Sequence, residues 1–199
     1  MARLGIMGGT FDPIHLGHLA TAESVRESMN LEKIIFIPAA NPPHKTEKKI
    51  ASSNHRLKMV EFAIQSNPFF EVSTMEIDRQ GLSYSLLTVE ELHEKFERAE
   101  LFFITGADAV NDLASWYHAF ELLEKCHFIA ATRGGSMLDW RSLEKFFGSL
   151  AREKIHEVQT PALEISSTDI RNRIANGRSI KYLVPDEVEK YIAREELYR

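Results

Sequence analysis

Short apolar runs alternate with amphipathic stretches over most of this chain. Buried strands of a parallel sheet read as continuous apolar runs, and a period of about 3.6 residues indicates helices. The alternation therefore predicts an α/β fold, a Rossmann-like doubly wound parallel sheet with helices on both faces and ligands at the carboxyl ends of its strands. The expected strands lie near 2–7, 33–38, 69–77, 100–105, 127–132 and 154–159, and the expected helices near 16–29, 54–66, 84–97, 108–124 and 139–149.

The last part of the chain has a different pattern, because two helical stretches follow one another without a strand between them. Residues 166–168 are Ser-Ser-Thr, which suit the start of a helix, and Asn-Gly at 176–177 is a stop signal. Pro185 is tolerated in the first turn of a second helix that ends near Leu197. No linker or repeat divides the sequence, so we expect residues 1–199 to form a single domain with a C-terminal helical segment.

Composition places the chain among ordinary globular proteins. Hydrophobic residues make up 44% and charged residues 27% of 199 residues, enough to bury a core without metals or disulfides. Cys126 is the only cysteine, so we expect a buried small hydrophobe in a protein of the reducing cytoplasm. A net charge of -5 argues against nucleic acid as a partner. The sequence has no apolar run of about eighteen residues and no signal-peptide pattern, so we expect no membrane association.

The stretch IMGGTFDPIHLGH, residues 6–18, carries the strongest chemical signal. An apolar strand breaks at Gly8-Gly9, and the chain then turns into a helix that carries His15 and His18. Adjacent glycines let the backbone approach a ligand closely, and the N–H groups at the start of a helix favour an anion. Because His15 and His18 are three residues apart, both lie on one helix face and can reach the same phosphate.

Each part of this stretch also has an ordinary explanation. A Gly-Gly turn can be a tight connection, Asp12-Pro13 is a common turn pair, and His-x-x-His can be a solvated helix face or half of a metal site. The complete order Gly-Gly-Thr-Phe-Asp-Pro-x-His-x-Gly-His is far rarer than its parts. It contains neither the Gly-Lys-Ser/Thr of a P-loop nor the Gly-x-Gly-x-x-Gly of a dinucleotide site. We therefore interpret it as a phosphate-binding motif, without a dedicated metal site.

Two later segments offer further groups for phosphates. The loop at 39–53 follows the second expected strand and carries His44, Lys45, Lys48 and Lys49, which could close over a phosphate or simply be solvated. The segment ISSTDIRNRI at 165–174 places three hydroxyl residues at a helix start and Arg171 one turn later. This combination suits a polyphosphate, although a plain helix cap followed by a surface arginine has the same pattern.

Two other segments offer groups for a nucleoside and a flat ring. In 78–92 a turn at Gly81 precedes a helix that begins near 83–85. In 105–118, Gly106 permits close approach and Asp108 can accept hydrogen bonds from ribose hydroxyls. Trp116 and Tyr117 in the same segment can stack on a ring, or they can be core aromatics that need no ligand.

These motifs together resemble those of the bacterial nicotinate-nucleotide adenylyltransferases, a family of the nucleotidyltransferase superfamily with a His-x-Gly-His core motif. The resemblance covers nearly the whole chain. It rests on GGTFDPIHLGH, PPHK, HR at 55–56, GLSYS, FFITGAD, WY, ISSTDIR and YLVPDEVEKYI. It implies a single nucleotidyltransferase domain that transfers the adenylyl group of ATP to nicotinate mononucleotide, giving deamido-NAD and pyrophosphate in NAD biosynthesis.

The resemblance also implies a role for individual residues. The catalytic residues would be His15, His18 and Arg171. ATP would be bound by Gly8, Gly9, Thr10, Phe11, Gly106, Asp108, Ser166, Ser167 and Thr168. The pyridine nucleotide would be bound by Lys45, Tyr84, Ser85, Trp116, Tyr117 and Arg133. Mg²⁺ would arrive with the ATP phosphates and keep several waters, so a carboxylate cage is unnecessary.

The sequence departs from the family pattern in two places. The usual Ser-Tyr-Thr reads Ser-Tyr-Ser at 83–85, which removes only a methyl group. The usual Arg-Pro-Gly after the fifth strand reads Arg133-Gly134-Gly135. The second change loosens the loop and leaves the role of Arg133 open.

The motifs supply hydrogen-bond donors and cations but no obvious nucleophile, so we expect direct displacement at the α-phosphorus, with catalysis by positioning and charge stabilisation. Sister transferases for phosphopantetheine or cytidylyl groups are the nearest alternative, and a nucleotide-binding regulatory module without turnover is another. The aromatic pair and GLSYS favour a pyridine substrate. The sequence leaves the oligomeric state open, a homo-oligomer included.

We also expect the acid, nicotinate mononucleotide, to be preferred over its amide. The residues expected around the ring, at 83–85 and 116–117, offer N–H and O–H donors, and no carboxylate is expected among them. A carboxylate only accepts hydrogen bonds, so it can satisfy such donors, whereas an amide would turn its NH₂ toward one of them.

Overall fold

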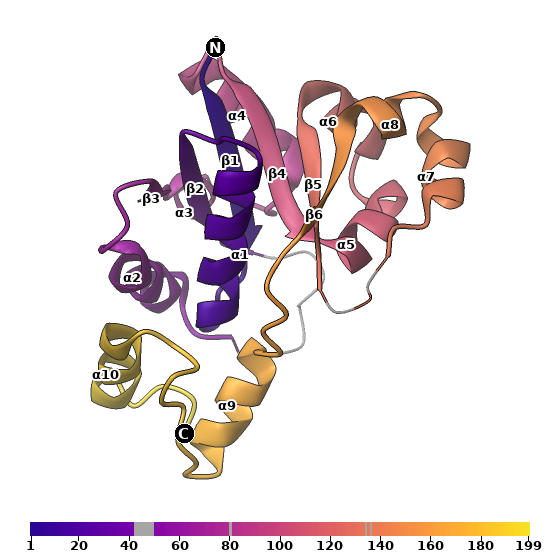
Figure 1. Cartoon of the computed structure of the whole chain (residues 1–199). Coiled ribbons are helices and arrows are strands. Elements are labelled where there is room, and N and C mark those ends of the chain that lie inside the picture. Colours follow the sequence, from indigo (N-terminus) through magenta and orange to yellow (C-terminus); the bar gives the residue numbers. More distant parts are fainter. Residues whose placement is uncertain (42–49, 80, 134, 136) are drawn as a thin grey trace.

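Six parallel strands form one sheet in the order β3-β2-β1-β4-β5-β6, with helices on both faces (Figure 1). The computed structural model describes residues 1–41, 50–79, 81–133, 135 and 137–199. The expected doubly wound fold is confirmed, and the strand order reverses between β1 and β4, where such sheets leave a crevice for ligands. The strands are β1 (Arg3–Gly9), β2 (Lys33–Pro38), β3 (Phe70–Val72), β4 (Glu100–Gly106), β5 (His127–Thr132) and β6 (Ile155–Gln159).

Alternate residues of each strand pack against opposite layers of helices. Leu4 and Ile6 of β1 belong to one core and Met7 to the other, as the period of two in a strand requires. The first layer contains α4 (Ser85–Lys95), α5 (Ala107–Asn111), the 3-10 helix η1 (Leu113–Ser115), α6 (Ala119–Lys125), α7 (Trp140–Phe147) and α8 (Leu150–Lys154), with the short α3 (Met75–Asp78) beside it. The second layer contains α1 (Leu16–Ser28), α2 (Ser53–Ile64), α9 (Ser167–Ala175) and α10 (Asp186–Arg194).

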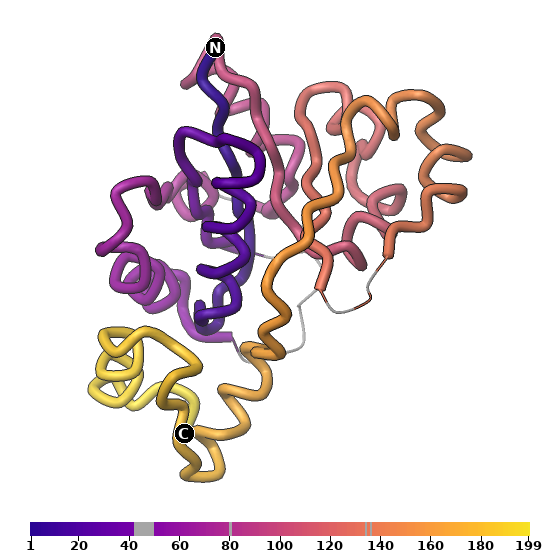
Figure 2. The backbone as a smooth tube through the Cα atoms, viewed as in Figure 1, coloured from indigo at the N-terminus to yellow at the C-terminus, as the bar shows by residue number. Residues whose placement is uncertain are grey.

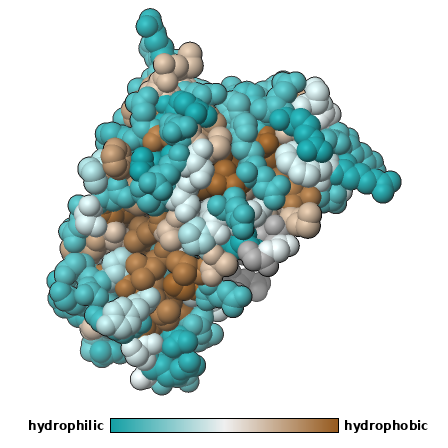
Figure 3. Space-filling view, viewed as in Figure 1, coloured by the Kyte–Doolittle hydropathy of each residue, from teal (hydrophilic) through white to brown (hydrophobic). Residues whose placement is uncertain are grey.

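The C-terminal segment leaves the sheet after β6 and packs back against α1 and α2. The backbone runs from β6 past the carboxyl ends of the strands into α9, and then turns so that α10 packs beside α2 (Figure 2). The Leu16 N–H donates to the Leu183 carbonyl oxygen at 3.0 Å, which ties this segment to the start of α1. Hydrophobic side chains gather on this face between α1 and the C-terminal helices (Figure 3), and Leu19, Ile165 and Leu183 are partly buried against the second core.

The strand expected at 69–77 is much shorter in the structure. It ends at Val72, and α3 occupies Met75–Asp78. The Thr74 hydroxyl donates to Asp78 Oδ2 at 2.6 Å, a local bond that favours a helical turn over an extended chain. Met75 of α3 packs against the first helical core instead of continuing the strand.

The helix expected at 108–124 is broken into three pieces. After α5 and η1 the chain becomes extended at Trp116, and His118 has a left-handed backbone with φ +49° before α6 begins. The Ser115 hydroxyl donates to the Asp112 carbonyl oxygen at 2.7 Å and so competes with the helical pattern. The break presents Trp116 and Tyr117 at the carboxyl edge of the sheet, a placement that a continuous helix would not give.

Two smaller expectations concern the ends of elements and the single cysteine. The helix expected at 139–149 stops at Phe147, because Gly148 has φ +61° and ends it. Cys126 is 1% exposed, and burial raises the pKa of its thiol well above the usual range. Its expected role as a buried small hydrophobe is confirmed.

Among the described residues, no helix has the length and apolar character needed to cross a membrane.

Two histidines lie side by side at the amino ends of β5 and β6. His127 Nδ1 and His156 Nε2 are 2.8 Å apart, and Glu100, Arg3 and Lys154 surround the pair. Burial lowers the pKa of His127 to about 4, with Lys154 and His156 acting in the same direction. Burial, followed by the charge of Arg3, also lowers the pKa of His156. Both rings are therefore neutral in the folded protein near pH 7.

The free energy of unfolding is expected to fall as the pH is lowered from 7 to 5. Both folded-state pKa values lie below the unfolded value of about 6.5, so the unfolded chain binds more protons in this window. We expect the pair to account for about 1 to 2 kcal/mol of this loss, measured by urea denaturation at the two pH values. The free energy of unfolding of the variant His127→Gln/His156→Gln should fall less between pH 7 and 5. It should still fall to some extent, because the buried His15 is unchanged and also contributes to the pH dependence. An equal loss in the variant would show that the pair does not carry the effect.

Candidate active site

Two neighbouring cavities open at the carboxyl ends of β1, β2 and β4, and Thr10 lines both of them. The aromatic cavity has a volume of about 480 Å³ and is lined by Gly8, Gly9, Thr10, Ala39, Glu76, Ser83, Tyr84, Ser85, Phe103, Thr105, Ser115, Trp116 and Tyr117. The cationic cavity has a volume of about 300 Å³ and is lined by Thr10, Phe11, Asp12, His15, His18, Arg133, Ile165, Ser166, Ser167, Thr168 and Arg171. Both lie at the reversal of strand order, where the fold places its ligands.

Gly8 and Gly9 make room for aromatic rings as well as for a ligand. A Cβ on Gly8 would lie 3.2 Å from the Phe103 ring, and one on Gly9 would lie 3.1 Å from the Phe11 ring. Phe11 itself has φ +49° and is 3% exposed, so its side chain is mainly a packing element. The glycines thus let two phenylalanine rings form the wall behind the carboxyl end of β1.

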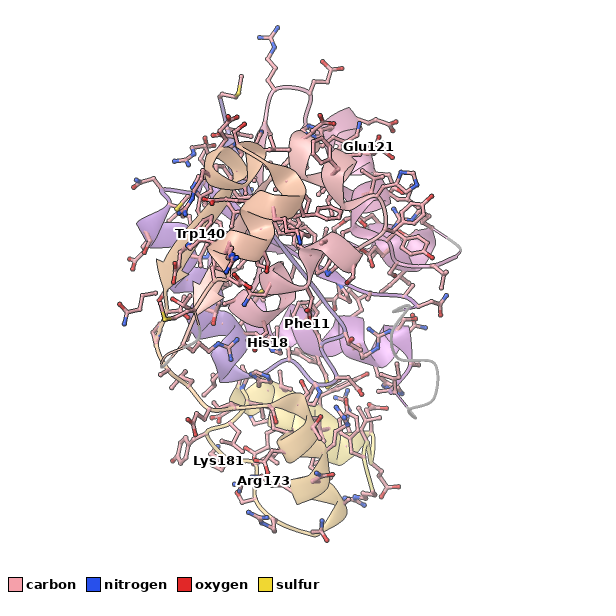
Figure 4. The ribbon with its side chains drawn as sticks, turned by 90° about the vertical axis from the view of Figure 1, so that its right-hand side faces the viewer. Phe11, His18, Glu121, Trp140, Arg173 and Lys181 are labelled. Carbon is pink, nitrogen blue, oxygen red and sulfur yellow. The ribbon has the colours of Figure 1, made fainter. Side chains whose placement is uncertain are left out.

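His15 and His18 lie where the sequence predicts them, at the first turn of α1. His15 is the N-cap, and its backbone N–H donates to His18 Nδ1 at 3.2 Å. The two rings stack with centroids 3.7 Å apart, and the Phe11 ring meets His18 edge-on at 5.2 Å. Because Nδ1 accepts this bond, a neutral His18 carries its proton on Nε2. Phe11 and His18 lie at the junction between the sheet and the C-terminal segment that carries Arg173 and Lys181 (Figure 4).

His15 adds little positive charge to the cationic cavity. His15 is 3% exposed, and burial, followed by the charge of Arg133, lowers its pKa to about 4. The ring is therefore neutral near pH 7, and its Nδ1 is buried without a hydrogen-bond partner among the described residues. Arg133 and Arg171 supply positive charge to the cavity, and the neutral His15 ring contributes a dipole.

The start of α9 forms one side of the cationic cavity. The Ser166 hydroxyl accepts from the Asp169 N–H at 3.1 Å, and the Ser167 hydroxyl donates to the Pro13 carbonyl oxygen at 2.8 Å. Arg171 donates from Nη2 to the Thr168 hydroxyl at 3.3 Å. Ser166 and Ser167 therefore also have structural roles, capping α9 and fixing it against the loop after β1.

Asp12 lines the cationic cavity and connects it to three other segments. It is 4% exposed, and its Oδ1 accepts from the Ala51 N–H at 3.2 Å and from the Tyr198 hydroxyl at 2.7 Å. Its carbonyl oxygen accepts from Arg171 Nη1 at 2.7 Å, and its Oδ2 lies 3.6 Å from the same nitrogen. Arg171 is thereby held with one edge of its guanidinium against the chain.

Arg56 of α2 is a second group that sequence reasoning did not assign to the site. It is 2% exposed, and it donates to the carbonyl oxygens of Thr10 at 2.7 Å, Ala51 at 3.0 Å and Ala40 at 3.3 Å. Burial lowers the pKa of Arg56, and the nearby charge of Asp12 opposes this shift. The guanidinium joins the ends of β1 and β2 to the start of α2.

Aromatic rings and one carboxylate define the aromatic cavity. Tyr84 and Tyr117 stack with centroids 4.3 Å apart, and Trp116 meets the Phe103 ring edge-on at 5.8 Å. Glu76, 7% exposed, accepts a hydrogen bond from the Thr88 hydroxyl at 2.6 Å and also faces the cavity. The expectation that no carboxylate lies near the ring-binding residues is therefore wrong. It failed because position 76 was assigned to a strand and no local pattern marks it as part of the site.

Most of the expected site residues line one of the two cavities, and the exceptions are Gly106, Asp108 and Lys45. Gly106 ends β4 and Asp108 is exposed in the first turn of α5, and neither lines these two cavities, although Thr105 beside them does. Arg133 was expected among the ring-binding residues but lines the cationic cavity. Lys45 lies outside the described residues. Glu76 and Tyr198 are groups that the sequence did not single out, whereas Asp12 and Arg56 belong to quoted motifs but were given no individual role.

Comparison with known proteins agrees with this architecture. The cytidylyltransferase-like family profile matches residues 6–173. A relative from Thermoanaerobacter sp. (strain X514), named probable nicotinate-nucleotide adenylyltransferase, is 51% identical over 99% of this chain and 94% of its own. One of the same name from Moorella thermoacetica is 49% identical over 99% of this chain and 92% of its own.

Solved structures show the same fold. The Plasmodium falciparum nicotinic acid mononucleotide adenylyltransferase complexed with NaAD superimposes with a TM-score of 0.82 at 21% identity, covering 100% of this chain and 98% of the other. The same protein complexed with APC gives 0.79 at 20% identity, with the same coverage. With this fold and with identities near one half over full-length relatives, the chain belongs to the nicotinate-nucleotide adenylyltransferases within the cytidylyltransferase-like family.

Proposed function

We propose that this protein transfers the adenylyl group of ATP to nicotinate mononucleotide, forming deamido-NAD and pyrophosphate in NAD biosynthesis. The observation that carries the proposal is the pair of adjoining cavities, one cationic and one aromatic, at the reversal of strand order in a chain of this family. The cationic cavity suits a polyphosphate, and the aromatic cavity suits a flat ring. Thr10 borders both, so a reacting phosphate at the boundary would reach groups from each side.

The cationic cavity would hold the triphosphate of ATP. Arg171 and Arg133 supply charge, and the start of α9 contributes the N–H groups and hydroxyls of residues 166–168. His18 would donate from Nε2 to the phosphate that gains charge in the transition state, because its Nδ1 is engaged by the His15 N–H. In this role His15 orients His18 and shields it, since its own ring is almost wholly buried.

The reaction would be a single in-line displacement. An oxygen of the 5′-phosphate of the acceptor forms a bond to the α-phosphorus of ATP, and the bond from that phosphorus to the bridging oxygen of the β-phosphate breaks. The electron pair leaves with pyrophosphate, whose charge Arg171 would stabilise. Cys126 is buried and lines neither cavity, so it is not a candidate nucleophile. The residues of the cationic cavity are suited to hold and polarise phosphates. Catalysis then consists mainly of positioning and charge stabilisation.

The donor set of the cationic cavity fits a magnesium ion that is bound chiefly by substrate. Asp12 is the one carboxylate in its lining, and its Oδ1 already accepts two hydrogen bonds. Among the described residues no cluster of three His, Cys, Asp or Glu could hold a metal. We therefore propose that Mg²⁺ is held by the ATP phosphates and water, where it neutralises part of their charge.

The aromatic cavity would hold the pyridine ring against Tyr84, Trp116 and Tyr117. The start of α4 lies at this cavity without a side-chain cap, so its first N–H groups can donate to the ring carboxylate. Glu76 acts in the opposite direction. Its negative charge favours the amide, whose pyridinium ring carries a net positive charge, over the acid, whose ring is a zwitterion. The balance of these two effects would set the acid preference.

We also propose that residues 1–199 act as one nucleotidyltransferase domain in the cytoplasm, with ATP and nicotinate mononucleotide as its small-molecule partners and with homo-oligomers as a further possibility. The shared sheet and the two cores that span the chain support the single domain. The C-terminal helices support it as well, because Arg171 reaches the first loop from α9.

A substrate competition tests the proposed function. With ATP present, nicotinate mononucleotide, its amide and phosphopantetheine are compared by pyrophosphate release. The acid should exceed the amide at least about tenfold in kcat/KM, because the amide NH₂ facing a buried donor costs about 1 to 3 kcal/mol. Glu76→Gln removes the charge that favours the amide, so the ratio of acid to amide should rise further. Preference for phosphopantetheine, or no pyrophosphate with any acceptor, would contradict the proposal.

His18→Ala tests the assigned catalytic donor. Loss of a preorganised donor to a developing charge lowers rates on the order of 10² to 10³, so kcat should fall far more than ATP binding weakens. His93→Ala is the matched control, because His93 bonds to the Lys125 carbonyl oxygen outside both cavities. A kcat of His18→Ala within about threefold of the unaltered enzyme would exclude this role.

A further inference from the structure

We propose that Tyr198 is a positioning residue for the phosphate clamp, acting through Asp12 to keep Arg171 turned toward the triphosphate of ATP. The inference rests on the proposed function, because it assigns a purpose to the cationic cavity. Tyr198 follows α10 and lies 186 positions from Asp12 in sequence, yet its hydroxyl donates to Asp12 Oδ1 at 2.7 Å. It does not line either cavity, so any effect on ATP must pass through another group.

The geometry of Asp12 explains how Tyr198 would influence the orientation of Arg171. Oδ1 faces Tyr198 and the Ala51 N–H, while Oδ2 lies 3.6 Å from Arg171 Nη1, too long for a strong ion pair. Arg171 instead donates Nη1 to the Asp12 carbonyl oxygen at 2.7 Å. The Tyr198 hydroxyl thus holds the carboxylate away from the guanidinium, which remains oriented by a neutral carbonyl group.

Without the Tyr198 hydroxyl, the Asp12 carboxylate would lack one of its hydrogen-bond donors and would bind another group. A buried carboxylate that loses a donor forms a bond with another group, and Arg171 Nη1 is already 3.6 Å from Asp12 Oδ2, whereas the nearby Arg56 donates to the carbonyl oxygens of Thr10, Ala40 and Ala51. A direct pair between the two would neutralise Arg171 and turn its Nη1 toward Asp12. The cationic cavity would then bind a polyphosphate less tightly, although all of its lining residues would still be present.

The backbone conformation near Tyr198 also indicates that its hydrogen bond to Asp12 stabilises the end of the described chain. Glu196 has φ +51° and Tyr198 has φ +68°, both in the left-handed region that is unfavourable for side chains with a Cβ. Such conformations persist where surrounding contacts compensate for them. The Tyr198 hydroxyl bond to Asp12 is such a contact, and burial raises the pKa of Tyr198 well above its usual range, so it stays a donor.

Tyr191 provides a matched control in the same part of the fold. Its hydroxyl lies 2.8 Å from His55 Nδ1, and its ring packs near Phe62. Like Tyr198 it joins the C-terminal segment to the body of the protein by one hydroxyl. Unlike Tyr198, it has no bond to Asp12 or to a residue of either cavity.

The experiment compares Tyr198→Phe with Tyr191→Phe in the full chain. Steady-state assays give KM for ATP, KM for nicotinate mononucleotide and kcat, and calorimetry gives the Kd of inorganic tripolyphosphate without turnover. For Tyr198→Phe we expect KM for ATP and Kd for tripolyphosphate to rise about three- to tenfold. This is less than the full effect of losing a bond to a charged group, because Tyr198 acts on the phosphates only through Asp12 and Arg171. KM for nicotinate mononucleotide should change less than about twofold, and Tyr191→Phe should leave all three near the parent values.

A second comparison keeps the proposal testable if Tyr198→Phe also lowers stability. In an Arg171→Lys background, Tyr198→Phe should raise KM for ATP by less than about twofold, because the group that it positions has already been replaced. Full additivity, an unchanged tripolyphosphate Kd in Tyr198→Phe, or an equal rise in Tyr191→Phe would overturn the positioning role. Absence of pyrophosphate release by the unaltered protein would instead overturn the proposed function, while the tripolyphosphate measurement would still decide the role of Tyr198.

Discussion

Asp12 places a carboxylate out of water at the end of β1, and a buried charge of this kind must be paired or hydrogen-bonded. Its partners are distant in sequence: Ala51 before α2, Arg171 on α9 and Tyr198 after α10. Satisfying this one group draws three segments to the carboxyl end of β1. Arg56 acts alongside it by holding the ends of β1 and β2 together. The cationic cavity exists because these segments meet there.

The electrostatics of the site follow from the same arrangement. Burial keeps the His15 ring neutral near pH 7, and the backbone N–H of His15 fixes the orientation of the His18 ring. Arg133 and Arg171 supply positive charge to one cavity, whereas the rings of Tyr84, Trp116 and Tyr117 line the other. In the proposed function a polyphosphate would occupy the first cavity and a weakly charged ring the second. The division into two cavities is thus also a division of charge.

Local sequence patterns predicted what depends on local physics. Continuous apolar runs predicted the parallel sheet, and the amphipathic pattern near 16–29 predicted the helix that starts next to His15. The break at His118 escaped prediction, because a left-handed residue without glycine has no local signal. Glu76 and Tyr198 escaped it as well. A polar side chain becomes buried only when remote partners such as Thr88 satisfy it, and such partners cannot be identified from a single sequence.

The central claim is that the acceptor phosphate attacks the α-phosphorus directly, with the protein positioning and polarising but forming no bond of its own. The stereochemical course at that phosphorus tests this claim most directly. ATP carrying a single diastereomer of an α-phosphorothioate is turned over with nicotinate mononucleotide, and the configuration of the dinucleotide product is determined. One in-line displacement predicts inversion. Retention would require two successive displacements through an adenylylated protein side chain, and it would contradict a site whose side chains only position and polarise the phosphates.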